Sequence, residues 1–265
     1  MWNAKNQGGY TIESTQAKEN MSEIGDYLMG LEPNQEGHLW TIDAVSAMIG
    51  NMLAEGGLNP WRWEGDYVAS TIELAEWYRR YHLDPSDPDY STDILRHGYG
   101  LVGFTPATDY INSNNASTLS QYGYAPNFSD SPGYATDGAA QMIYIVDNFA
   151  YWWGNVNGTV AANIKRNYAD TFERMGFNET MIDNIAWMTR EDFIQGLRPS
   201  GNTALLFELT AAFMVHFEQP SYDPDVNHLD TRIGYAYEVQ EYFEDNPPTP
   251  YIPLMESNWK FYLFL

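Results

Sequence analysis

One stretch, residues 41–55, constrains the fold most, because a strong helical pattern there runs into an acidic side chain. Its apolar stripe holds Val45, Met48 and Met52 at spacings of three and four residues. This spacing is typical of the buried face of a helix. The next step of three along the same face reaches Glu55. The pattern therefore predicts a core helix whose apolar face ends in a carboxyl group.

The surroundings expected for Glu55 point to acid chemistry. Apolar neighbours and the negative end of the helix dipole both disfavour the charged carboxylate. The pattern therefore predicts a carboxylic acid that keeps its proton near neutral pH, as a glycosidase needs in order to protonate a leaving oxygen. The alternative is a glutamate at a frayed helix end that points into solvent.

Glycine and tryptophan around this helix suggest a cleft. Thr41 or Asp43 can cap the start of the helix, and the pair Gly56-Gly57 ends it and lets another backbone approach. The rings of Trp61 and Trp63 follow, and they either line a sugar site or pack in the core. A second glycine-rich stretch, residues 98–106, predicts a tight turn or short hairpin.

The rest of the chain predicts a mainly α fold in one domain. Helical patterns follow near 20–31, 68–82, 137–153 (with Asp137 as a cap), 159–175, 179–188, 190–197, 202–218 and 227–244. We expect an N-terminal segment over 1–40, a catalytic domain over 41–245, and a Pro-rich, then hydrophobic, C-terminal tail over 246–265.

Composition excludes several classes of protein. The net charge of −23 argues against nucleic acid and anionic membranes as partners, although acidity also serves solubility. The chain has no cysteine, which excludes disulfides and thiolate chemistry. Its five histidines are scattered, so we predict no metal and no cofactor. We also expect no secretory signal and no membrane span.

Four blocks of the sequence, taken in order, resemble the phage tail lysozyme family, as found in the tail-knob morphogenesis proteins of small short-tailed phages. The similarity covers about residues 15–240. The blocks are residues 44–60, the glycine-rich stretch 98–106 with its continuation to 112, residues 141–145, and residues 211–220.

This resemblance implies a lysozyme-like fold and cleavage of the linkage between N-acetylmuramic acid and N-acetylglucosamine, with Glu55 as general acid. It places substrate along the glycine-rich segment, at Tyr99, Gly100, Gly103, Phe104 and Thr105. It also implies a virion protein of the tail tip, with other tail proteins as partners and the host peptidoglycan as substrate.

The sequence departs from the family pattern at two positions. The family commonly has Gln-Trp where this chain has Gly103-Phe104, so a side chain able to bind sugar is lost. The family usually has a serine directly after the glutamate at this helix end, whereas this chain has Gly56 after Glu55. Relatives can add a zinc peptidase domain, which the scattered histidines do not predict here.

The partner of Glu55 stays open at this level. A second carboxylate, where the reaction uses one, is sought among Asp66, Asp109 and Asp137, with Glu64 as a further candidate. Hydrolysis and lytic transglycosylation are both compatible with a single acid.

Three functions compete. The leading one is a virion muramidase that opens the wall during DNA ejection, with its apolar end, residues 259–265, docked in the tail. The second is a structural tail component without catalysis, for which Gly103 is the best support. The third is a free endolysin, although the residues after Asn246 are too few for a typical wall-binding module.

Overall fold

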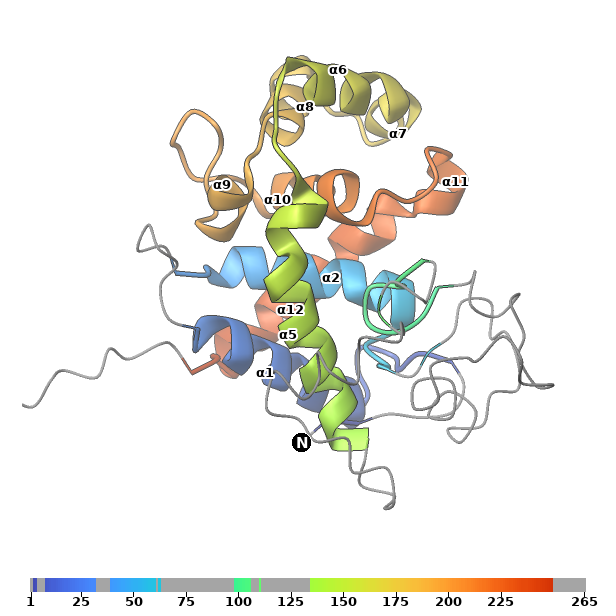
Figure 1. Ribbon diagram of the computed structural model, residues 1–265, viewed down its shortest axis with the longest axis vertical. Helices are drawn as coiled ribbons and strands as arrows, with labels where there is room; N and C mark the ends of the chain where they lie inside the picture. Colours follow the sequence, from blue (N-terminus) through green and yellow to red (C-terminus); the bar gives the residue numbers. More distant parts are fainter. Residues whose placement is uncertain are drawn as a thin grey trace, which may run out of the picture.

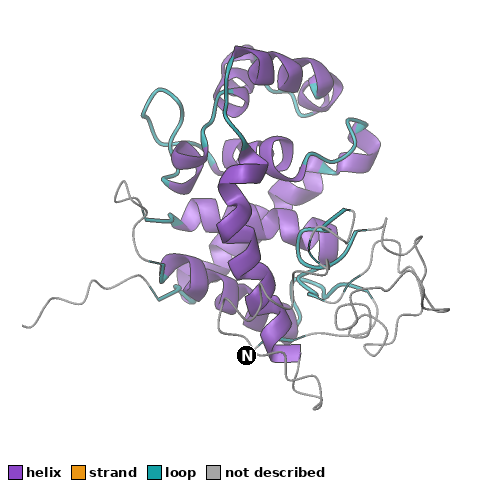
Figure 2. Cartoon of the chain, in the orientation of Figure 1, coloured by secondary structure: helices purple, strands orange, loops and turns teal. Residues whose placement is uncertain are grey.

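The computed structural model describes residues 2–3, 8–31, 39–60, 62, 98–105, 110 and 134–249, and within these ranges it is built of helices without a strand (Figure 1, Figure 2). The helices are α1 (Thr15–Met29), α2 (Ile42–Gly56), α5 (Tyr134–Trp153), α6 (Gly158–Asn167), α7 (Ala169–Arg174), α8 (Glu179–Ala186), α9 (Arg190–Ile194), α10 (Leu206–Phe213), the π-helix η5 (Met214–Glu218), α11 (Pro224–Asn227) and α12 (Leu229–Asp245). The prediction of a mainly α, lysozyme-like domain is confirmed.

Helix α2 forms the centre of the core, as its apolar pattern predicts. The side chain of Thr41 caps its first turn by accepting from the backbone N–H of Ala44. Gly57 ends it in the left-handed conformation, with φ of 54°. Between these caps the helix is buried nearly all round, and it contacts α1, α9, α10 and α12. Such a helix can be accommodated only if its neighbours cover every face.

The closest approach in the core joins α2 and α12 at a glycine. A Cβ atom at Gly50 would lie 2.7 Å from the backbone nitrogen of Ala236 and 2.8 Å from its Cα. The missing side chain therefore lets the two backbones nearly touch. Arg232 lies one turn before Ala236 in α12, so this approach brings its side chain to the last turns of α2.

The helix predicted over 202–218 begins later and changes form. It starts as α10 at Leu206 and widens after Phe213 into η5, where the backbone N–H of Gln219 donates to the carbonyl of Met214 at 2.8 Å. Gln219 itself is left-handed, with φ of 48°. Helix α5 packs against η5, where aromatic rings of the two elements meet. Such π-turns recur at functional sites because they redirect the side chains that follow.

Other predicted boundaries need correction. Helix α5 begins at Tyr134, so Asp137 is inside its first turn and is not its cap. Pro132 and Gly133 are the nearest helix-breaking residues, and the helix starts directly after them. The helix predicted over 159–175 breaks at Tyr168 into α6 and α7. The helix predicted over 68–82 and the chain from residue 250 lie outside the described residues.

The N-terminal segment packs on the same core. Helix α1 buries its apolar face against α2 and α5. Ahead of it, the backbone N–H of Tyr10 donates to the carbonyl of Gly57 at 2.9 Å, and Asn59 donates to the carbonyl of Gly8 at 2.8 Å. These two hydrogen bonds anchor the turn that follows α2 to the segment that precedes α1. No helix in the described ranges is both long and apolar enough to cross a lipid bilayer.

We predict that Gly50→Ala lowers the free energy of unfolding by about 1–3 kcal/mol, because the new methyl group must push α12 away. Chemical denaturation measures this change. Gly234→Ala is the matched control, since Gly234 is exposed in α12 and a Cβ there meets nothing within 4 Å. The control should gain up to about 1 kcal/mol from helix propensity. Equal stability of the two variants would contradict the close crossing.

Candidate active site

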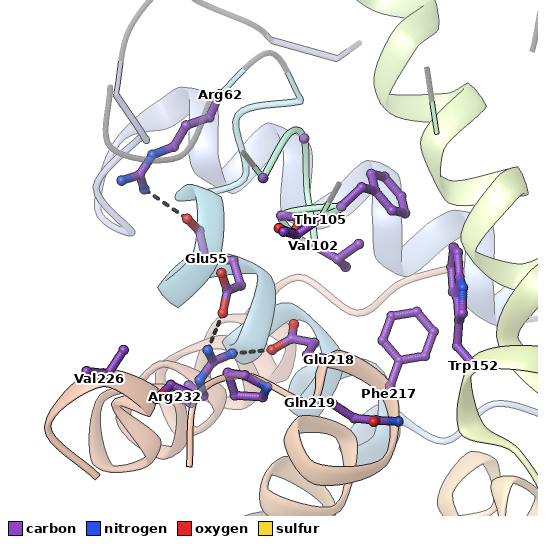
Figure 3. A pocket seen from close by; sticks show the side chains of 16 residues that line it. Glu55, Arg62, Val102, Thr105, Trp152, Phe217, Glu218, Gln219, Val226 and Arg232 are labelled. Carbon is purple, nitrogen blue, oxygen red and sulfur yellow. Dashed lines mark hydrogen bonds and ion pairs between the residues drawn. The ribbon is translucent and has the colours of Figure 1, made fainter. Parts of the chain in front are cut away.

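A cleft of about 710 Å³ opens at the C-terminal end of α2 (Figure 3). It lies between this helix end, the glycine-rich turn, the end of α5, and the segment that runs from η5 to α12. Its lining residues are Glu55, Arg62, Gly98, Gly100, Val102, Gly103, Phe104, Thr105, Trp152, Phe217, Glu218, Gln219, Pro220, Ser221, Val226 and Arg232. Its volume is within the range of ligand-binding clefts.

The glycine-rich turn forms one wall of the cleft. Tyr99 and Phe104 exchange two backbone hydrogen bonds, of 3.2 and 2.9 Å, which close a tight turn. Gly100 and Gly103 have φ of 83° and 57°, a region that favours glycine. The turn expected in this stretch is therefore present, as a single antiparallel bridge.

A buried glutamine of α5 fixes this wall to its neighbour. The side-chain carbonyl of Gln141 accepts from the backbone N–H of Leu101 at 2.8 Å, and its amide donates to the carbonyl of Pro60 at 2.6 Å. The N–H of Gly100 also donates to the carbonyl of Arg62 at 2.8 Å. The segment after α2 and the glycine-rich turn are thus tied together on α5.

Glu55 lies in the last turn of α2, with its side chain 29% exposed toward the cleft. Its Oε1 accepts from Nη2 of Arg232. Its Oε2 faces the glycine-rich turn, where a Cβ at Gly103 would approach it to 3.1 Å. Nη1 of Arg62 donates to the backbone carbonyl of Glu55 at 3.0 Å and so helps to end the helix. Oε1 of Glu55 is therefore engaged by Arg232, and Oε2 faces the glycine-rich turn.

Arg232 is the buried cation of the site, with a side chain only 3% exposed. Its Nε donates to the carbonyl of Asn227 at 2.7 Å, and Nη1 donates to Oδ1 of Asn51 at 3.1 Å. The same Nη1 also pairs with Oε2 of Glu218. One guanidinium thus bridges two carboxylates, as Figure 3 shows. The sequence pattern predicted apolar neighbours for Glu55 and did not predict this cation.

Glu218, at the end of η5, is the second carboxylate at the cleft. Its side chain is 3% exposed, and its Oε1 has no hydrogen-bond partner among the described residues. Burial raises the pKa of Glu218 to about 8; the nearby Glu55 adds to this rise and Arg232 opposes it. Two ionised carboxylates and one guanidinium would carry a net charge of −1, which a single proton removes.

Aromatic side chains line the cleft where the glycine-rich turn meets α5 and η5. The ring of Trp152 lies 5.7 Å from that of Phe104 and 5.1 Å from that of Phe217. Beside them, Thr105, Gln219 and Ser221 offer polar groups. Rings and hydroxyl or amide groups in one cleft suit a ligand with both apolar faces and hydroxyl groups, such as a sugar. Among the described residues, no cluster of acidic or histidine side chains is suited to hold a metal ion.

The structure brings part of the predicted substrate segment to the cleft. Gly100, Gly103, Phe104 and Thr105 line it. Tyr99 is not among the lining residues: its side chain is 1% exposed and stacks on Tyr110 with 6.2 Å between ring centroids, and its contact with substrate stays a prediction. The remaining predicted residues, Trp61, Trp63, Glu64, Asp66 and Asp109, lie outside the described residues. Asp137 is in the first turn of α5.

Sequence reasoning missed Arg232, Glu218 and Trp152. One signal for Arg232 existed, since it is the sole lysine or arginine between Arg198 and Lys260 in a very acidic chain. A lone cation on a helix that packs in the core has to meet a carboxylate. The sequence pattern does not indicate which carboxylate Arg232 contacts, because the contact joins residues far apart in the sequence.

A helical core that presents a carboxylate at a helix end, facing a broad cleft walled by a glycine-rich turn, defines the lysozyme-like class of proteins. The phage tail lysozyme family model matches residues 34–243, which is most of the chain, and the chain belongs to this family. A comparison with curated proteins found no match.

We predict that Glu218→Gln changes how stability depends on pH. The pKa of Glu218 rises from an ordinary 4.5 to about 8 on folding, so the folded chain holds a proton that the unfolded chain releases. This contribution to stability is fully present below pH 4.5 and is lost as pH rises to about 8, by at most about 1.4 kcal/mol per pH unit. The glutamine variant should lack this decline.

Denaturant unfolding of both chains between pH 5 and 8 measures the difference. His216 is buried and its pKa is lowered to about 4 by burial. Both chains keep His216, so its own contribution cancels when the two curves are subtracted. Parallel curves for the two chains would contradict the raised pKa of Glu218.

Proposed function

We propose that the protein is a muramidase of a phage tail, which cuts the glycan strand of bacterial peptidoglycan with Glu55 as its general acid. The observation that carries this proposal is the position of Glu55, partly exposed at the end of a buried helix and facing a cleft of about 710 Å³. Membership of the phage tail lysozyme family supports the same substrate class.

The geometry of Glu55 suits proton donation. Its Oε2 is the oxygen that faces the glycine-rich turn. A proton passes from this oxygen to the glycosidic oxygen, the C1–O bond breaks, and the leaving sugar departs as an alcohol. Glu55 is left as a carboxylate, and Arg232 on its Oε1 stabilises that new charge. C1 then bonds to the oxygen of a water molecule, or of a sugar hydroxyl in a transglycosylase, and the proton released from that oxygen returns to Glu55. The acid therefore has one oxygen for the reaction and one for its counter-ion.

The walls of the cleft supply the binding groups. The partly buried ring of Trp152 suits the apolar face of a sugar, with Phe104 and Phe217 packed beside it in the cleft lining, while Thr105 and Ser221 offer hydroxyl groups. The tie made by Gln141 keeps the glycine-rich turn at a fixed distance from α2. The substrate-binding residues proposed here are these, together with Gly100, Gly103 and the two tryptophans Trp61 and Trp63.

The proposed place of action is the tail tip, where the enzyme opens the wall locally during DNA ejection. Family membership supports this location. Other tail proteins are the proposed partners, with the apolar end of the chain, residues 259–265, as the docking segment. The net charge of −23 disfavours nucleic acid and membranes as partners.

We predict that Glu55→Gln abolishes clearing of purified peptidoglycan, by at least about a hundredfold, because an amide cannot supply the proton. Turbidity assays and zymograms measure this loss. Glu241→Gln, the same change at an exposed position of α12, is the control and should clear as the wild type does. Wild-type protein that never clears peptidoglycan would instead support a structural tail protein.

Mass spectrometry of purified virions tests the location. We expect the protein among the tail components at a fixed ratio to them. Its absence from virions, combined with presence in lysates, would support the free endolysin in place of the tail enzyme.

A further inference from the structure

We propose that Arg62 selects an anionic glycan strand at this cleft, because its guanidinium is placed to bind a carboxylate that an N-acetylmuramic acid unit carries. This inference rests on the proposed function and names the chemical feature of peptidoglycan that the cleft recognises. In intact peptidoglycan the carboxylates belong to the stem peptide, which is joined by an amide bond to the lactyl group of the sugar. Where the stem has been removed, the lactyl group itself is a carboxylate.

Two arginines line the cleft, and they differ in their partners. Arg232 is engaged by two carboxylates, those of Glu55 and Glu218. Arg62 forms no ion pair with the described residues, and its Nη1 donates to the backbone carbonyl of Glu55 at 3.0 Å. Because a carbonyl oxygen does not balance a full positive charge, the charge of Arg62 is left for a ligand.

The backbone of Arg62 is fixed on both sides. Its N–H donates to the carbonyl of Asn59 at 3.0 Å, and its carbonyl accepts from the N–H of Gly100 at 2.8 Å. Figure 3 shows the side chain of Arg62 beside the last turn of α2, with its guanidinium at the backbone of Glu55. A carboxylate bound by Arg62 therefore holds the strand close to the proposed acid.

Two nitrogens of the Arg62 guanidinium have no hydrogen-bond partner among the described residues. Nε is buried and donates to none of them, while Nη2, which donates to none of them either, is not buried. A buried donor without a partner is uncommon in folded proteins and calls for an explanation such as a water or a ligand. Nε and Nη2 share the edge of the guanidinium that pairs with both oxygens of a carboxylate. A carboxylate at Nη2 that bridges to Nε would satisfy both donors.

The charge of the whole chain gives this local cation its importance. With a net charge of −23, the field of the protein repels a polymer that carries carboxylates. Salt screens such repulsion beyond a Debye length, which is about 10 Å at moderate ionic strength. A direct contact between Arg62 and a carboxylate in the cleft acts inside that distance. Arg62 therefore supplies local attraction where the chain as a whole supplies none.

The test measures binding with the Glu55→Gln chain, which should hold the strand without cutting it, and with the same chain carrying Arg62→Gln as well. The probes are intact peptidoglycan and glycan strands stripped of their stems by an amidase, each with free carboxylates and with the carboxylates converted to amides. We expect Arg62→Gln to weaken binding to a carboxylate-bearing probe by about tenfold, the size of one lost hydrogen bond to a charged group. Binding to the amidated probes should not change.

The two carboxylate-bearing probes distinguish the sources of the anion. Weaker binding to intact peptidoglycan alone assigns the carboxylate to the stem peptide, and weaker binding to stripped strands alone assigns it to the lactyl group. The difference between the parent chain and Arg62→Gln should shrink as salt is added, because salt screens the charge.

Arg166→Gln is the matched control, since it removes the same unit of charge. Arg166 lies on α6, outside the cleft lining, and its guanidinium donates to the side chains of Asn163 and Asn167. This variant should bind every probe as the parent chain does, which separates a local contact from the change in net charge. Arg62→Lys, which keeps the charge, should recover part of the lost affinity.

Two results would overturn the role of Arg62. If Arg62 acts only by ending α2, Arg62→Gln weakens binding to free and amidated probes equally and at every salt concentration. If Arg62 has no part in binding, Arg62→Gln binds every probe as the parent chain does. Should Arg62→Gln fail to fold, the parent chain decides the question, because it should bind a carboxylate-bearing probe about tenfold more tightly than its amidated counterpart. Equal binding of the two would contradict the proposal.

The remaining outcomes separate this inference from the proposed function. Wild-type protein that prefers the carboxylate-bearing probes through Arg62 but never clears peptidoglycan overturns the muramidase and supports the role of Arg62. Clearing by wild type, lost in Glu55→Gln, together with equal binding of free and amidated probes, overturns the role of Arg62 and leaves the general acid intact. A chain that binds none of the probes overturns both.

Discussion

The contact between Arg232 and two carboxylates is the interaction on which the rest of the site depends. Removing one member of a buried ion pair typically costs about 3–5 kcal/mol, because the remaining charge is left without a partner. Here the buried members are Arg232 and Glu218, and Glu55 joins them from the edge of the cleft. Gly50 lets α12 approach α2 closely, one turn from Arg232. A packing detail in the core therefore decides the electrostatics of the cleft.

The local part of this arrangement could be predicted from sequence. Helix α2 follows from the periodicity of Val45, Met48 and Met52, and its ends follow from Thr41 and Gly57. The glycine-rich turn follows from the need for left-handed backbone at Gly100 and Gly103. These features depend on residues close together in the chain, so local propensity and pattern carry them. Sequence similarity added the family, which the pattern alone does not give.

The tertiary part could not be predicted in the same way. Arg232 and Glu55 are far apart in sequence, and neither helix pattern indicates their contact. The expected helix over 202–218 ends as a π-turn, which places Glu218 and Gln219 differently from an ordinary helix. No residue type in that segment indicates this change. Asp137 was expected to cap a helix that in fact starts at Tyr134. The contact of Arg232 with Glu55 comes from packing between elements, which a single sequence does not record, whereas the start of α5 follows the local pair Pro132-Gly133.

Gly103 shows how the sequence and the structure have to be interpreted together. In the sequence it is a departure from the family pattern, which suggests a lost sugar contact and hence a protein without catalysis. In the structure it has φ of 57°, and a Cβ there would come within 3.1 Å of Oε2 of Glu55. A side chain on this backbone would be strained, and its Cβ would press on that carboxylate oxygen. In this turn the left-handed backbone and the nearby carboxylate therefore account for the glycine, so the departure from the family pattern has a local structural reason.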